Sequence, residues 1–127
     1  MEKIREIIER VDKIKPNAFK QDVKVRWIAE LDGMIATEVM LMCTTDAEQL
    51  KYSCPDDLES EPLVGFPHSG IYDLWLCAKI DFTNGEYNKY QNTMEMFNAN
   101  YKAFVRWFAA TYEPAQGYRK ENYYGDV

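Results

Sequence analysis

The sequence predicts an all-α protein with four main helices. Large apolar residues recur at alternating spacings of three and four, which is the period of an amphipathic helix. The longest such pattern runs from Tyr87 to Thr111 without a slip, whereas a strand would scatter these residues over both faces. A seam this apolar must be covered by the rest of the chain or by another subunit. Its members are Tyr87, Tyr90, Met94, Phe97, Tyr101, Phe104, Phe108 and Thr111.

The first helix is predicted over residues 2–14. Apolar residues repeat along one face, and charged residues fill the other. Glu6 and Arg10 have opposite charges one turn apart, which stabilises a helix slightly. Pro16 should end the element, because proline cannot continue a helix. The predicted core positions are Ile4, Ile7, Ile8, Val11 and Ile14.

A second helix of about twenty residues is predicted from Asp22 towards Cys43. Gly33 lies inside it, where glycine costs ~1 kcal/mol relative to alanine. This position therefore predicts either a bend in the helix or the close approach of another backbone. The apolar face consists of Trp27 or Ile28, Leu31, Ile35, Val39 and Met42.

Residues 44–68 interrupt the helical periodicity. Their composition, with Pro55 and Pro62 around an acidic stretch, is that of a loop, and it leaves room for a short β-hairpin within 48–66. The apolar run from Leu63 to Pro67 should be extended. A loop of this length is unusual in a small compact domain and is often functional.

The third helix is predicted to start after Ser69 and to be central, because apolar residues widen its inward face. Asn84-Gly85 ends it, since both residues tolerate left-handed backbone angles. This short link places the third and fourth helices in an antiparallel hairpin. Pro114 is predicted to close the fourth helix. We therefore expect a single helical domain over residues 1–112 and a C-terminal arm over 113–127.

Composition excludes several classes of function. The chain has a formal net charge of −6, which argues against bulk or sequence-specific binding of nucleic acid and against an anionic membrane surface. No apolar run approaches the ~20 residues that span a bilayer. The charged N-terminus does not resemble a signal peptide, so we expect synthesis in a cytosol. Hydrophobic residues make up 46% of the chain, enough for a real core.

We predict no catalytic residues, no metal and no cofactor. Cys43, Cys54 and Cys77 form no C-x-x-C pair, so neither a disulfide framework nor a zinc site is indicated. His68 is the single histidine, and a helix-terminus hydrogen-bonding role suits it better than catalysis, because no motif supplies a partner nucleophile.

The carboxylates suggest structure rather than chemistry. The acidic loop residues are expected to be solvated; weak Ca²⁺ binding is the alternative, although their spacing does not match an EF-hand. Two helical aspartates, Asp32 and Asp81, lie among apolar neighbours and are expected to form structural ion pairs, for example with Arg26 or Lys79. The loop acids are Asp56, Asp57, Glu59 and Glu61.

Several short motifs together resemble a known family. They are Leu31-Asp32-Gly33, Leu63-Val64-Gly65-Phe66-Pro67, Tyr72-Asp73-Leu74-Trp75, Ala78-Lys79-Ile80-Asp81, Asn84-Gly85-Glu86-Tyr87, Tyr90, Met96-Phe97-Asn98 and Tyr101. Across residues 5–112 the chain resembles the small helical head-completion adaptors, or head–tail connector proteins, of tailed phages and prophages of Gram-positive bacteria. The motifs are structural rather than catalytic.

The resemblance implies a virion protein made in the bacterial cytoplasm and without enzymatic activity. Such subunits form a homo-oligomeric ring between the portal and tail proteins, which would be its partners. Aromatic residues and arginine dominate interface energetics, so the interface residues we expect are Trp107, Tyr118, Arg119, Tyr123 and Tyr124.

Two other functions stay open. An acidic helical regulatory module could bind a host protein, and it would require acidic side chains along one continuous face. A small metal-dependent hydrolase would require a cluster of metal ligands.

Overall fold

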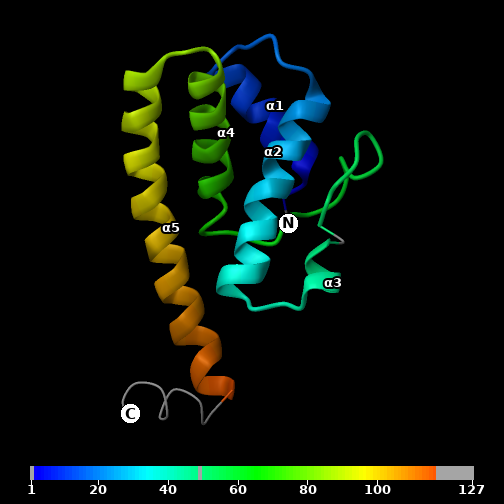
Figure 1. The fold of residues 1–127 in the computed structure, drawn as a ribbon, viewed down its shortest axis with the longest axis vertical. Helices are drawn as coiled ribbons and strands as arrows, with labels where there is room; N and C mark the ends of the chain where they lie inside the picture. The colour runs from blue at the N-terminus through cyan, green and yellow to red at the C-terminus, as the bar shows by residue number, and fades with distance from the viewer. Residues whose placement is uncertain (1, 49, 117–127) are drawn as a thin grey trace.

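The computed structural model describes residues 2–48 and 50–116 of the 127-residue chain. Within these ranges every regular element is a helix, so the predicted all-α class is confirmed (Figure 1). The elements in chain order are α1 (Ile4–Ile14), α2 (Gln21–Met34), a π-helical turn η1 (Ile35–Val39), α3 (Thr44–Glu48), α4 (Gly70–Thr83) and α5 (Tyr87–Gln116).

α1 buries one face in the core. Ile4, Ile7, Ile8 and Val11 are each 1% exposed or less. The prediction that Ile14 shares this burial is wrong, because its side chain is 65% exposed in the last turn of the helix. Val11, three residues earlier, is buried, so the buried face of α1 ends before Ile14.

α2 runs directly into η1. The turn that departs from α-helical geometry starts at Ile35, not at Gly33, where the bend is predicted. The Thr37 hydroxyl donates a hydrogen bond to the Gly33 carbonyl oxygen at 2.9 Å, a local bond that competes with regular helix geometry. A methyl group on Gly33 would meet no described atom within 4 Å, so close backbone approach does not explain this glycine. Leu41, with a left-handed φ of 56°, follows the irregular turn.

The segment between η1 and α4 contains α3 and a series of turns. The hairpin allowed for within 48–66 is wrong, since no strand occurs in this segment apart from residue 49, which is not described. Many of its backbone groups bond to one another in turns, and two of its carbonyl groups bond to α1. The amides of Ile4 and Arg5, at the start of α1, donate to the carbonyl oxygens of Ser60 and Leu58, each at 2.9 Å.

α4 is the central helix and packs against α1, α2 and α5. α4 and α5 lie side by side, and α5 extends well past the start of α4 (Figure 1). Gly85 turns the chain between them with a left-handed φ of 79°. In the seam of α5, Phe97 and Phe104 are 4% and 1% exposed, whereas Tyr87 is 58% exposed. The middle of the seam is therefore core, and its first turn is surface.

The C-terminal boundary differs from the predicted one. α5 continues to Gln116, so Pro114 does not end the helix, and residues 113–116 belong to α5 rather than to an arm. Proline in the last turn removes only one backbone hydrogen bond, and its φ is compatible with a helix. Residues 117–127 lie outside the described part of the chain.

Candidate protein-interaction site

A buried carboxylate anchors the long loop to the helices. Asp32 of α2 is 0% exposed. Its oxygens accept hydrogen bonds from the Tyr52 hydroxyl at 2.7 Å, the Tyr72 hydroxyl at 2.5 Å and the Leu63 amide at 3.1 Å. The Val64 amide in turn donates to the Tyr72 oxygen at 2.9 Å. Two consecutive loop amides are thus tied to α2 and α4.

The prediction that Asp32 and Asp81 form ion pairs with Arg26 or Lys79 is wrong. Asp32 bonds to tyrosines and a backbone amide, because its side chain faces the loop. Asp81 has the Lys15 ammonium at 3.0 Å, although neither of its oxygens has a well-aligned hydrogen bond among the described residues. Lys79 binds Glu30 instead, with 3.3 Å between nitrogen and oxygen.

Burial raises the pKa of Asp32 above the ordinary 3.8, although its hydrogen bonds from Tyr52, Tyr72 and Leu63 oppose the shift. Because the folded state then holds the proton more tightly, it binds more protons than the unfolded state between the two pKa values. We expect the free-energy contribution of Asp32 to folding to decrease as pH rises from 3.8 through the folded pKa.

This pH dependence can be isolated by comparing the wild type with Asp32→Asn. The free energies of unfolding are measured by urea denaturation at several pH values, and the wild-type value minus the variant value should fall as pH rises. Groups shared by both proteins cancel in this difference. A difference that is flat or rises with pH would contradict the expectation.

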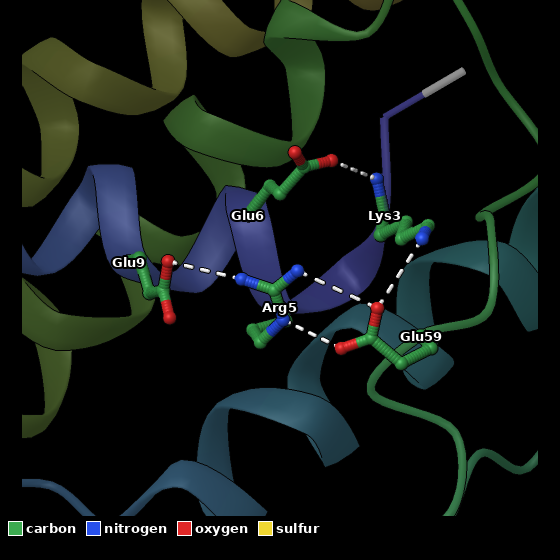
Figure 2. A network of polar contacts seen from close by, with 5 residues as sticks. All are labelled: Lys3, Arg5, Glu6, Glu9 and Glu59. Atoms are coloured by element: carbon green, nitrogen blue, oxygen red, sulfur yellow. Dashed lines mark hydrogen bonds and ion pairs between the residues drawn. The ribbon is translucent and has the colours of Figure 1, made fainter.

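A second set of contacts ties the loop to α1 (Figure 2). Arg5 Nε donates to Glu59 at 2.6 Å, and the Lys3 ammonium lies 3.3 Å from the same carboxylate. Arg5 also lies 3.4 Å from Glu9. The hydrogen bonds from Arg5 and Lys3 lower the pKa of Glu59, and the bond from Arg5 contributes most. Glu59 of the acidic loop is therefore paired with α1, although its side chain stays 58% exposed.

Two residues beyond the anchored Val64, one aromatic side chain is held out in solvent. Pro62 and Val64 are buried, whereas the Phe66 side chain is 93% exposed. Because the amides of Leu63 and Val64 are fixed, the position of Phe66 is limited to a small region of space. An aromatic group on a pre-organised segment loses little entropy when a partner covers it.

Phe66 lines a hollow of about 260 Å³ between the loop, the end of η1 and α5. We call it the Phe66–Trp107 groove. Trp107 is 42% exposed there, and the His68 ring packs at 5.1 Å from the Trp107 ring between centroids. Leu41, 64% exposed, follows Met40 in the chain. The residues lining the groove are Met40, Leu63, Val64, Gly65, Phe66, Phe104, Trp107 and Phe108.

Of the interface residues expected from the sequence, Trp107 lies in this groove. Tyr118, Arg119, Tyr123 and Tyr124 lie outside the described residues. Sequence reasoning missed Phe66. Its neighbour Val64 belongs to the same apolar run and is buried, so the sequence pattern alone did not mark Phe66 as exposed.

His68 takes part in packing and in the start of α4. Its carbonyl oxygen accepts a hydrogen bond from the Ile71 amide at 3.3 Å. Its ring lies 5.8 Å from Phe104 between centroids, edge to face.

A larger hollow of about 580 Å³ lies between α2 and the α3 region. Its rim carries charges of both signs, Arg26 and Lys51 against Glu30 and Glu48. Within residues 2–48 and 50–116, no three His, Cys, Asp or Glu side chains are grouped to hold a metal ion. In the same ranges no helix has the length and apolar character of a membrane span.

Comparison with known proteins gives no relative for this arrangement. The chain matches no family model, no curated protein and no solved structure.

Proposed function

We propose that this chain is a structural adaptor of a tailed-phage head–tail connector, which assembles into a homo-oligomeric ring and binds portal and tail proteins without catalysis. The observation that carries the proposal is the Phe66 side chain, 93% exposed on an anchored segment beside Trp107. Burying one such ring against a partner contributes about 2 kcal/mol. A fixed apolar surface suits protein contact better than it suits chemistry on a small substrate.

A second apolar surface supports ring packing. Phe82 and Tyr87, at the turn between α4 and α5, are 52% and 58% exposed. Phe82 and Tyr90 line a hollow of about 310 Å³, and the Tyr87 ring lies 5.5 Å from the Phe82 ring between centroids. Twenty residues of α5 separate Tyr87 from Trp107, which is about 30 Å along a helix. Two distinct surfaces are what head-to-tail contacts need, because each copy then binds its neighbours through different faces.

The charge distribution around α1 gives no support to the acidic regulatory module. Glu9 and Glu59 alternate with Arg5 and Lys3 on one face, rather than forming a continuous acidic surface (Figure 2).

The proposal is tested by Phe66→Ser. We expect the variant to bind the portal and tail proteins of the same gene cluster more than tenfold more weakly than the wild type, because about 2 kcal/mol of apolar burial is lost. Binding is measured by calorimetry, and ring formation by light scattering and electron microscopy. Ile14→Ser is the matched control, since Ile14 is also exposed, at 65%, but lies on α1. Equal binding by the wild type and Phe66→Ser, or no binding by either, would refute the adaptor role.

A further inference from the structure

The hollow between α2 and the α3 region is lined by cations that the described chain does not neutralise. Arg26 and Lys51 line it, and within residues 2–48 and 50–116 neither side chain has a hydrogen bond or an ion pair. Glu30 lines it too, but its carboxylate is engaged by Lys79 at 3.3 Å. The two cations therefore outnumber the remaining lining carboxylate, that of Glu48, so the hollow favours an occupant with negative charge.

Gly33 leaves room in this hollow for a large side chain. Glycine weakens the interior of a helix relative to alanine, and a methyl group on Gly33 would meet no described atom within 4 Å. The space above its backbone is therefore open to another molecule. The hollow measures about 580 Å³, whereas a cavity of about 150 Å³ already holds benzene. An aromatic ring fits over Gly33 with space for its neighbours.

The loop that carries Phe66 has the composition of such an occupant. Residues 52–69 contain four carboxylates and no lysine or arginine. The Asp56 and Glu61 carboxylates are exposed, and among the described residues they have no hydrogen bond or ion pair. Phe66 is 93% exposed and does not line the hollow of its own chain, so its ring is available to another copy.

The spacing on the two surfaces matches. Glu61 and Phe66 are five residues apart, which is at most about 17 Å. Arg26 and Gly33 are seven residues apart on α2, which is about 10 Å along a helix. One loop can therefore place a ring over Gly33 and a carboxylate beside Arg26 at the same time.

We propose that this hollow binds the Phe66 loop of a second copy of the chain, with Phe66 against Gly33 and the loop carboxylates against Arg26 and Lys51. The contact is head-to-tail, because the loop and the hollow are different surfaces and each copy keeps one of them for the next. The inference rests on the proposed ring and names the neighbouring copy as the partner that covers Phe66. Weaker portal and tail binding by Phe66→Ser then follows from loss of the ring.

Charge reversal on each surface tests the pairing. Arg26→Glu with Lys51→Glu reverses the hollow, and Asp56→Lys with Glu61→Lys reverses the loop. Either double variant alone should self-associate roughly tenfold or more weakly than the wild type, because like charges then meet. An equimolar mixture of the two should restore association, since the reversed loop faces the reversed hollow and the unchanged loop faces the unchanged hollow.

Self-association is measured by sedimentation equilibrium from micromolar to millimolar concentration, and circular dichroism checks that helicity is unchanged. Three results would overturn the proposal: a wild type that stays monomeric throughout this range, double variants that associate like the wild type, or a mixture that associates no better than its components.

Gly33→Gln separates the contact from the stability of the fold. Glutamine favours a helix more than glycine does, and its side chain would project into the open space. The free energy of unfolding should therefore not fall, whereas self-association should weaken roughly tenfold or more because the hollow is filled. Met96→Gln is the control at a 54% exposed position on α5 that does not line the hollow, and it should leave association unchanged. Wild-type association by Gly33→Gln would contradict the proposal.

These measurements use the purified chain alone, so their outcome is distinct from that of the adaptor role. Self-association that Gly33→Gln abolishes, in a protein that binds neither portal nor tail, would keep the contact and reject the adaptor. Portal and tail binding by a wild type that never self-associates would keep the adaptor and reject the contact.

Discussion

Replacing Phe104 with alanine is expected to lower the free energy of unfolding by about 3–5 kcal/mol. Phe104 is 1% exposed, so its ring leaves a cavity rather than a surface gap. Ring centroids of Tyr101, Trp107 and Phe108 lie 6.3, 6.2 and 6.1 Å away, and rigid neighbours of this size fill such a cavity poorly. The loss should therefore include a cavity cost as well as the lost transfer free energy.

Tyr87→Ala is the matched control, because it removes an aromatic ring from the same seam of α5 at a position 58% exposed. We expect this change to cost less than about 1 kcal/mol. Both values come from urea denaturation followed by circular dichroism. If the two substitutions destabilised the protein equally, burial of the middle of the seam against the rest of the chain would be refuted.

Asp32→Ala is expected to lower the free energy of unfolding by about 3 kcal/mol. The change removes the acceptor of three hydrogen bonds and leaves the donors Tyr72 and Leu63 in or near the core. A buried donor without a partner costs about 1–3 kcal/mol. Part of this cost is offset because a desolvated carboxylate is also removed.

Asp32→Ala should loosen the loop around Leu63 and Val64 more than it loosens the rest of the fold. Hydrogen exchange at the Leu63 and Val64 amides should speed up more than exchange in α1. The Leu63 amide loses its acceptor, and the Tyr72 hydroxyl that accepts from the Val64 amide loses the carboxylate that fixes it. Glu30→Ala is the control on the same helix. The Glu30 carboxylate is exposed and pairs with Lys79 at the surface, so a loss below about 1 kcal/mol is expected. Unchanged exchange at Leu63 and Val64 would show that Asp32 does not hold the loop.

Much of the fold could be predicted because helices are local. The spacing of Ile4, Ile7, Ile8 and Val11 identifies both a helix and its buried face, and the structure buries all four. The same reasoning failed at Ile14, which is 65% exposed. A helical period shows which side of a helix is apolar, but it does not show how far along the helix the neighbouring elements cover that side. Local rules also placed the end of α5 too early at Pro114.

Much less of the candidate site than of the fold could be predicted from the sequence. Trp107 was expected at an interface because of its residue type, and the structure leaves it 42% exposed in the groove. Phe66 was not singled out, because its exposure depends on how the loop is anchored. The position of Asp32 in a helix among apolar residues pointed to a structural ion pair with a basic partner, whereas the structure buries it against two tyrosine hydroxyls and a backbone amide.

The sequence alone determined that the chain is helical and which residues form most of its core, because a helix is encoded by side chains three and four positions apart. Only the tertiary structure decided how the loop is held and which aromatic ring stays in water. The bonds responsible join Asp32 to residues 20, 31 and 40 positions away. No local period encodes contacts over such separations; they exist only because the packing of α2 and α4 brings these groups together.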